Sequence, residues 1–188
     1  VMVEIQATVM KECHSPQQVE DLLGRLFPTR EITKVLLVNP PDAHASLFRL
    51  DTAQRRRYTN YPPYGLASLA QHLRSIGIAV HITNLNHEIL RHSIESQSNG
   101  TFDFEGTWKS KLNEDIYNFQ PDLVGVTCMF TMTHTSFKEV CQQVAEYNIP
   151  LAIGGVHVTN DVERILDDIP VANVAFLREG DIAIEQFV

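Results

Sequence analysis

The chain has 188 residues, with 15 Lys and Arg against 23 Asp and Glu, which gives a formal net charge of −8. Its hydrophobic content of 44% is typical of a globular rather than a disordered chain, and at roughly 150 residues per domain the length predicts one domain with a small appendage. The acidic balance argues against nucleic acid or an anionic membrane as a partner, because such surfaces demand neutralising Lys and Arg.

The N-terminal sequence, the apolar runs and the cysteines indicate the cellular compartment of the protein. No apolar run approaches the ~18–20 residues of a membrane helix, and the first residues lack the basic start and apolar core of a secretory signal. The widely spaced Cys13, Cys128 and Cys141 indicate buried thiols in a reducing compartment, which we expect to be the cytoplasm. No CxxC pair is present, so we expect no cysteine-only metal site within this chain.

Residues 1–33 are predicted to form an N-terminal extension with a short helix. Ser15 can cap this helix, and Pro16 suits its first position. The next apolar residues recur at helical spacing until Pro28 ends the helix. They are Val19, Leu22, Leu23 and Leu26.

From residue 34 onward, short apolar runs alternate with helical patterns. Runs that are apolar on both faces suit parallel strands covered by helices on each side. The expected strands are residues 34–39, 78–85, 123–128, 150–153 and 171–177. The expected helices contain Leu66 to Leu73 with Gly77 as the stop, Leu112 to Phe119, Phe137 to Ala145, and Val162 to Leu166 with Asn160 as the cap, and another begins at Asp181. Residues 42–63 and 86–108 are expected to be polar and irregular.

This alternation predicts an α/β fold, because parallel neighbours need crossover helices. We expect a doubly wound five-stranded parallel sheet over residues 34–188, in the Rossmann-like or flavodoxin-like order 2-1-3-4-5, with its last helix truncated. Ligands of such sheets bind beyond the carboxyl ends of the strands, at the switch point. The loops to inspect therefore follow Val38, Val126, Ile153 and Phe176.

Three of these four loops have unusual sequences: those after the fourth and third strands, and the loop after the first strand with its arginines. Gly154 and Gly155 can let backbone lie against a ligand where a Cβ would collide, although a tight turn explains them equally well. Residues 127–134 place small hydroxyls beside apolar side chains, which suits a large, flat, partly apolar ligand. Alternatively, Met129, Phe130 and Met132 simply cover the sheet edge. There is no GxGxxG and no GxxxxGK[ST], so dinucleotide and P-loop sites lose their sharpest support.

Other candidate groups are less specific. The arginines at 55–57 can meet a phosphate or another domain, or form a solvated loop. His87 and Glu88 lack the second histidine of HExxH. Cys128 and His157 could form a nucleophile pair, but no third, orienting group is evident. The residues alone therefore predict no catalytic constellation.

Taken together, the loops resemble the N-terminal cobalamin-binding domain of cobalamin-dependent radical S-adenosylmethionine (SAM) enzymes. The matching stretches occur in family order: VLLVNPP at 35–41, YPPYGLASLAQHLRSIGIAV at 61–80, PDLVGVTCMF at 121–130, IGGVHVT at 153–159 and REGD at 178–181. The resemblance implies a cobalamin site at the strand ends. Its residues would be Asn39, Pro40, Tyr64, Thr127, Cys128, Met129, Gly154, Gly155, Val156, His157, Glu179 and Gly180.

Cobalamin domains more widely contain DxHxxG, SxL and GG in the loops after the first, third and fourth strands. Residues 127–129 stand at SxL, and the resemblance implies that Thr127 meets the nucleotide tail of cobalamin beside the double glycine. Residues 42–47 keep the Asp and His spacing of DxHxxG but end in leucine and follow two prolines. We therefore expect that His44 does not ligate cobalt.

In this family, the chemistry belongs to a second domain whose CxxxCxxC motif holds a [4Fe–4S] cluster. That motif is not in this chain, so the resemblance implies a larger protein in which a downstream radical SAM domain binds SAM and a small-molecule substrate. The typical reaction is methyl transfer to an unactivated carbon, and this chain alone would not be catalytic. Two alternatives stay open: a non-catalytic sensor of cobalamin or another small ligand, and an unrelated enzyme on a flavodoxin-like sheet.

Overall fold

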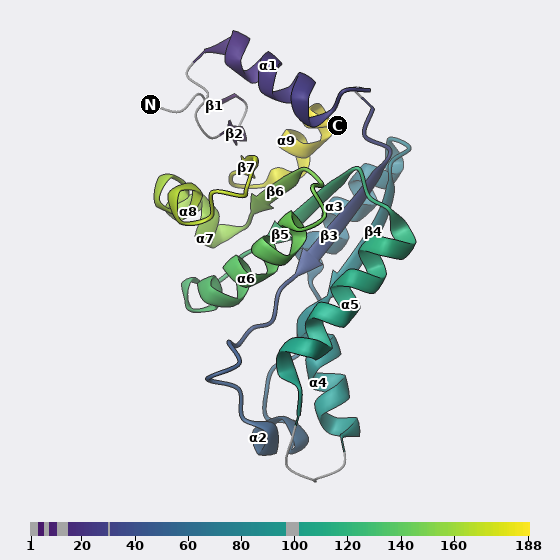
Figure 1. Cartoon of the computed structure of the whole chain (residues 1–188), viewed down its shortest axis with the longest axis vertical. Coiled ribbons are helices and arrows are strands. Elements are labelled where there is room, and N and C mark those ends of the chain that lie inside the picture. The colour runs from purple at the N-terminus through teal and green to yellow at the C-terminus, as the bar shows by residue number, and fades with distance from the viewer. Residues whose placement is uncertain (1–3, 6–7, 11–14, 30, 97–101) are drawn as a thin grey trace.

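The computed structural model describes residues 4–5, 8–10, 15–29, 31–96 and 102–188, which build a sheet covered by helices (Figure 1). The strands are β1 (Glu4–Ile5), β2 (Thr8–Met10), β3 (Lys34–Asn39), β4 (Ala79–Asn84), β5 (Leu123–Thr127), β6 (Leu151–Gly154) and β7 (Val174–Phe176). The helices are α1 (Pro16–Leu26), α2 (Leu50–Gln54), α3 (Tyr64–Ser75), α4 (Leu85–Glu95), α5 (Phe104–Phe119), α6 (His134–Ala145), α7 (Val156–Asn160), α8 (Val162–Asp168) and α9 (Gly180–Phe187), with a 3-10 turn, η1 (Thr131–Thr133).

The sheet has the order β1-β2-β7-β6-β5-β3-β4, and the strands from β7 to β4 are parallel. When these five parallel strands are numbered along the chain, their order is 2-1-3-4-5, which confirms the predicted doubly wound topology. Val35 of β3 pairs with Val80 of β4 on one side and with Leu123 of β5 on the other. Because these strands are parallel, their carboxyl ends meet at one edge of the sheet.

Side chains of β3 alternate between two cores, one on each face of the sheet. Leu36 and Val38 enter the core under α4 to α8, whereas Val35 and Leu37 enter the core under α1, α3 and α9. All four are at most 2% exposed. Figure 1 looks onto the first of these faces, with α5 and α6 in front of the sheet and α3 behind it. The apolar run of β3 is thus explained by burial on both sides.

The N-terminal extension contributes two strands that the sequence pattern did not reveal. β2 pairs antiparallel with β7, with Val9 opposite Ala175, and β1 pairs antiparallel with β2. Both strands are too short to show a period of two, so only their pairing identifies them. They cover the edge of β7 that would otherwise present unpaired backbone groups.

The predicted helix of the extension is α1. The Ser15 side chain accepts a hydrogen bond from the backbone N of Gln18 at 3.3 Å, as expected of a capping serine. Phe27 follows the helix and meets Phe187 of α9 edge to face, with 5.8 Å between ring centroids. The extension therefore shares the core formed by α3 and α9.

The expectation of an irregular segment at 86–108 was wrong for residues 86–95 and 104–108, which are helical. Residues 97–101 lie outside the described residues. α4 begins directly after β4, and the side chain of Asn84 caps it by accepting a hydrogen bond from the backbone N of His87 at 3.1 Å. Its buried Leu85 and Ile89 are one helical turn apart, but the polar residues around them hid this period. α4, α5 and α2 together form the lower part of the molecule in Figure 1.

Two short helices also occupy segments that were expected to be loops or turns. α2 lies inside the predicted loop at 42–63, although the arginines at 55–57 follow it and are exposed, as expected. α7 begins directly after Gly155, and Asn160, which we expected to cap the next helix, is the last residue of α7. Asp161 precedes α8 instead. Helices of five residues are set by tertiary contacts rather than by sequence period.

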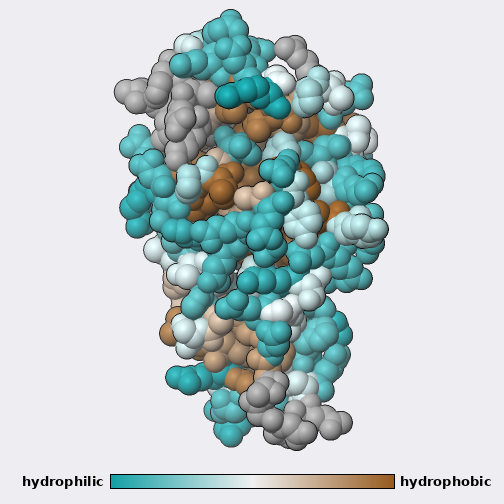
Figure 2. Space-filling view, viewed as in Figure 1, coloured by the Kyte–Doolittle hydropathy of each residue, from teal (hydrophilic) through white to brown (hydrophobic). Residues whose placement is uncertain are grey.

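The surface is mainly hydrophilic on the face that Figure 1 shows. Figure 2 shows apolar groups there only as smaller patches between hydrophilic side chains. Over the ranges described above, no helix combines the length and apolar character that crossing a membrane requires.

Asp122 joins the starts of β3 and β5. Its Oδ2 accepts hydrogen bonds from the backbone N of Thr33 at 2.8 Å, from Thr33 Oγ1 at 2.9 Å and from the backbone N of Lys34 at 2.9 Å. Partial burial alone would raise the pKa of Asp122, but these hydrogen bonds outweigh it and hold the pKa below the ordinary 3.8.

We expect Asp122→Ala to lower the free energy of unfolding by about 1–3 kcal/mol at pH 7, because three donors lose their charged acceptor. Since the pKa is lower in the folded state, this stabilisation is complete above the unfolded pKa and is lost as the pH falls through the folded pKa. Urea denaturation at pH 7 and pH 3 tests this: the difference from wild type should shrink at pH 3. Asp167→Asn, at an exposed carboxylate of α8, is the control. An Asp122→Ala variant as stable as wild type at pH 7 would contradict the assignment.

Candidate functional site

The loops after β5 and β6 interlock at the carboxyl edge of the sheet. The backbone N of Cys128 donates to the carbonyl oxygen of Gly154 at 2.8 Å, and the backbone N of His157 donates to the carbonyl oxygen of Cys128 at 3.1 Å. These two bonds extend the β5–β6 pairing past the ends of the strands. The structure therefore brings together the predicted residues of these two loops.

Gly155 packs closely against the loop after β5. Its φ of 104° lies in the region that favours glycine, and a Cβ there would lie 2.5 Å from the carbonyl oxygen of Cys128 and 2.9 Å from Thr127 Oγ1. Gly154 is less constrained, since its Cβ would lie 3.3 Å from the carbonyl oxygen of Phe176. The close approach that the double glycine predicts is thus made by backbone of the chain itself at Gly155.

Apolar side chains of the loop after β5 form a rim at this edge. Met129, Phe130 and Met132 are 48%, 60% and 84% exposed, and Val156 of the neighbouring loop is 52% exposed. This exposure leaves apolar surface available to a ligand. We call these four residues the apolar rim. An exposed apolar rim at the ligand-binding edge of a parallel sheet fits a ligand with a broad apolar face.

Cys128 is buried beneath this rim, and its thiol bonds within its own loop. Its Sγ lies 3.5 Å from both Thr133 Oγ1 and the carbonyl oxygen of Phe130. Burial raises the pKa of the Cys128 thiol and, more strongly, that of Cys141, so both stay protonated near neutral pH. The ring of His157 turns toward other partners, so the possible Cys128–His157 pair does not form. Cys13 lies outside the described residues.

His157 belongs to a hydrogen-bond chain that the sequence did not reveal. Its Nδ1 lies 3.1 Å from Thr131 Oγ1, and its Nε2 lies 3.0 Å from Nδ1 of His134. Nε2 of His134 lies 2.8 Å from Oδ2 of Asp168. Asp168 lies on α8 and His134 on α6, so no short spacing in the sequence indicates that they are in contact. Burial, with His134 and Arg164 nearby, lowers the pKa of His157 below the ordinary 6.5.

The loop after β3 is held by α4. Nδ2 of Asn39 donates to Oδ1 of Asn84 at 3.1 Å. Asp42 and Asn86 bond twice: the backbone N of Asp42 donates to Oδ1 of Asn86 at 3.1 Å, and Nδ2 of Asn86 donates to Oδ2 of Asp42 at 2.9 Å. Pro40 is buried in this loop. Asn39 and Pro40 therefore belong to a second group of strand-end residues, organised by the start of α4.

Both ring nitrogens of His44 have partners within the protein. Nδ1 lies 2.7 Å from Oγ of Ser46, and Nε2 lies 3.1 Å from Oε1 of Glu139 on α6. Glu139 lies on α6, the helix that follows β5, so the loop after β3 contacts the crossover connection between β5 and β6. His44 thus ties the loop after β3 to α6.

The remaining predicted residues lie at the starts of helices on the other face. Tyr64 is the first residue of α3 and is 74% exposed. Glu179 precedes α9 and Gly180 begins it, and a Cβ on Gly180 would make ordinary contacts with side chains of Phe176 and Leu69. These residues share the carboxyl edge of the sheet with the interlocked loops, although their contacts are made with α3 and β7.

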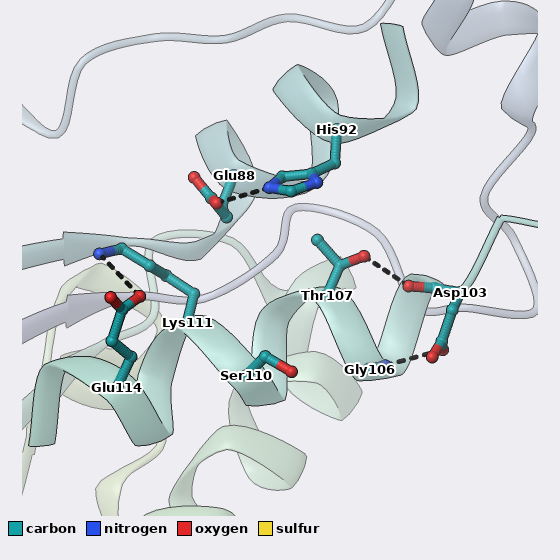
Figure 3. Close-up of a pocket in the computed structure, with 8 residues that line it drawn as sticks. All are labelled: Glu88, His92, Asp103, Gly106, Thr107, Ser110, Lys111 and Glu114. Carbon is teal, nitrogen blue, oxygen red and sulfur yellow. Dashed lines mark hydrogen bonds and ion pairs between the residues drawn. The ribbon is translucent and has the colours of Figure 1, made fainter. Parts of the chain in front are cut away.

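A polar pocket of about 370 Å³ lies between α4 and α5, away from the interlocked loops (Figure 3). Its lining residues are Glu88, His92, Asp103, Gly106, Thr107, Ser110, Lys111 and Glu114. Within the wall, Glu88 pairs with His92 at 2.9 Å and Lys111 with Glu114 at 4.0 Å (Figure 3). Lys111 also pairs with Asp115, outside the lining, at 2.8 Å. The sequence missed this pocket because α4 was expected to be irregular.

Comparison with known proteins identifies related domains. A family model described as a B12 binding domain matches residues 53–188. A protein of Pyrococcus horikoshii described as an uncharacterized methyltransferase is 26% identical over 160 residues, which are 84% of this chain but only 29% of that protein. This chain thus spans less than a third of that relative.

Two solved structures share the fold. One is the methanol:cobalamin methyltransferase complex of Methanosarcina barkeri, with a TM-score of 0.50 and 15% identity over 84% of this chain and 47% of that chain. The other is a cobalamin-binding protein from Desulfitobacterium hafniense DCB-2, with a TM-score of 0.51 and 13% identity over 90% of this chain and 67% of that chain.

We expect Gly155→Ala to lower the free energy of unfolding by about 2–4 kcal/mol, because it combines a disfavoured φ with a clash against backbone. Gly154→Ala is the matched control and should cost roughly 0.5–1.5 kcal/mol, since its Cβ meets one carbonyl oxygen at a longer distance. Urea denaturation of both variants measures the difference. Equal losses of stability would show that the close approach at Gly155 does not constrain the two loops.

Proposed function

Because this chain belongs to the B12 binding domain family, we propose that it holds cobalamin at the carboxyl ends of its parallel strands and serves as the cofactor module of a longer methyltransferase. The observation that carries this proposal is the family match over residues 53–188, which includes both interlocked loops. The relative described as a methyltransferase, of which this chain covers 29%, supports the longer protein.

The strand-end residues fit a large ligand with an apolar face. Covering the apolar rim with such a ligand would remove its exposed side chains from water, which is favourable. Hydroxyls of Thr127 and Thr131 lie beside the rim and can bond to amide groups at the ligand's periphery. We assign cofactor contacts to the predicted residues: Asn39, Pro40, Tyr64, Thr127, Cys128, Met129, Gly154, Gly155, Val156, His157, Glu179 and Gly180.

We further propose a downstream radical SAM domain as the partner of this chain. The order of the motifs from residue 35 to residue 181 supports this partner, and SAM and a [4Fe–4S] cluster belong to that domain. Bound cobalamin would supply a cobalt ion able to carry a methyl group toward a carbon of a small-molecule substrate. The residues of this chain bind and orient the cofactor and leave bond breaking to the partner domain. The free, buried thiols of Cys128 and Cys141 support a reducing, cytoplasmic location.

A visible absorption titration with hydroxocobalamin tests the proposal. We expect saturable binding, and Thr127→Val should weaken it roughly threefold to tenfold, the loss of one hydrogen bond of about 0.5–1.5 kcal/mol. Thr135→Val, at an exposed hydroxyl of α6, is the matched control and should bind as wild type does. Wild type that binds no hydroxocobalamin would overturn the function, whereas equal affinities of wild type and Thr127→Val would overturn the role of Thr127.

The lower face of cobalt provides a separate test. Because Ser46 and Glu139 occupy both ring nitrogens of His44, we expect His44 not to coordinate cobalt. The electron paramagnetic resonance spectrum of the protein with cob(II)alamin should show no threefold splitting from an imidazole nitrogen of His44, and His44→Ala should leave the spectrum unchanged. A triplet splitting that disappears in His44→Ala would contradict this expectation.

A further inference from the structure

Four hydrogen-bonded side chains form a series behind the apolar rim. The series runs from Thr131 through His157 and His134 to Asp168, with successive donor–acceptor distances of 3.1, 3.0 and 2.8 Å. Asp168 ends the chain at the surface, where Nζ of Lys138 donates to its other oxygen, Oδ1, at 2.6 Å. Lys138 and His134 hold the pKa of Asp168 below the ordinary 3.8, so the carboxylate is charged at neutral pH.

When His134 is neutral, the charged carboxylate determines every donor in this series of hydrogen bonds. Asp168 can only accept, so the single hydrogen of neutral His134 lies on Nε2 and its Nδ1 is bare. Nε2 of His157 must therefore donate to Nδ1 of His134, which leaves Nδ1 of His157 as an acceptor. The Thr131 hydroxyl fills this acceptor with its only hydrogen. The oxygen lone pairs of Thr131 are then free to accept a hydrogen bond from a ligand.

From this geometry we infer that His134 and Asp168 are positioning residues of the cofactor site. They act through His157, which accepts the hydrogen of the Thr131 hydroxyl. The oxygen of Thr131 is then available to accept a hydrogen bond from a ligand. The inference rests on the proposed function, because the ligand is the cobalamin bound at the apolar rim. The primary amides at the periphery of cobalamin supply the N–H groups that such an acceptor recognises.

The surroundings keep both histidines in this arrangement. His157 is 3% exposed, and it faces His134 from α6 and Arg164 from α8, both of which disfavour its charged form. Asp161, which precedes α8, pairs with Arg164 and partly offsets this effect. On the β5 side, the backbone N of His157 donates to the carbonyl oxygen of Cys128, whose thiol is protonated because burial raises its pKa.

Asp168→Asn should reverse the whole chain. Lys138 holds the position of Oδ1, so the asparagine carbonyl oxygen takes that place and its amide nitrogen faces His134 as a donor. Nε2 of His134 must then accept, and both histidines move their hydrogen from Nε2 to Nδ1. Nδ1 of His157 would donate to Thr131, whose hydrogen would turn toward the ligand.

Long-range proton–nitrogen NMR spectra of the ¹⁵N-labelled protein at pH 8 report these tautomers directly. We expect Nε2–H for His134 and His157 in wild type and Nδ1–H for both in Asp168→Asn. Asp167→Asn, one residue earlier and exposed, removes the same charge and should leave wild-type tautomers. Wild-type His157 as the Nδ1–H tautomer, or an Asp168→Asn spectrum like that of wild type, would overturn the inference; the wild-type spectrum decides even if a variant does not fold.

Hydroxocobalamin titrations at pH 8 link the hydrogen-bond chain to the ligand. Asp168→Asn should change the dissociation constant by roughly threefold to tenfold in the wild-type background, the size of one hydrogen bond. In a Thr131→Val background it should change nothing, because no hydroxyl remains to reorient. Equal effects in both backgrounds would overturn the inference. Wild type that binds no hydroxocobalamin would overturn the proposed function and the inference with it, whereas binding without the expected tautomers would overturn the inference alone.

Discussion

Burial of β3 on both faces is the constraint on which the arrangement of this molecule depends. Its side chains alternate between two cores, so helices must cover the sheet on each side. Parallel neighbours require crossover connections, and these return every strand in the same direction. The loops after β3, β5, β6 and β7 therefore meet at one edge. A ligand site at this edge follows from how the core is buried, before any particular side chain is considered.

The interlocked loops give this edge its shape. Gly155 lets the carbonyl group of Cys128 approach closely, and the bonds around Cys128 tie the two loops into one unit. With the backbone held in this way, the apolar rim stays exposed. Beneath it, His157 connects the rim to α6 and α8 through His134 and Asp168. A rigid polar support under an exposed apolar surface is suited to holding a large cofactor in one orientation.

The sequence predicted the parallel strands and their order because their signal is strong. Apolar runs such as Val35 to Val38, bounded by proline or glycine, are typical of strands buried on both faces. Helix ends with local chemistry, such as Ser15 before α1 and Gly77 after α3, were also predicted correctly. The prediction failed for β1, β2, α2, α4 and α7. These elements are short or rich in polar residues, and tertiary contacts decide their structure.

For the site, the sequence by itself determined which loops meet and which residue types they present. Strand ends follow from periodicity, and the glycines and apolar residues after β5 and β6 are local features of the chain. Only the tertiary structure decided how these groups bond. It turned His44 to Ser46 and Glu139, separated the ring of His157 from the thiol of Cys128, and joined His157 to an aspartate on another helix. The physical reason is that such bonds depend on the packing of α6 and α8 against one sheet, and sequence spacing carries no record of distances between separate elements.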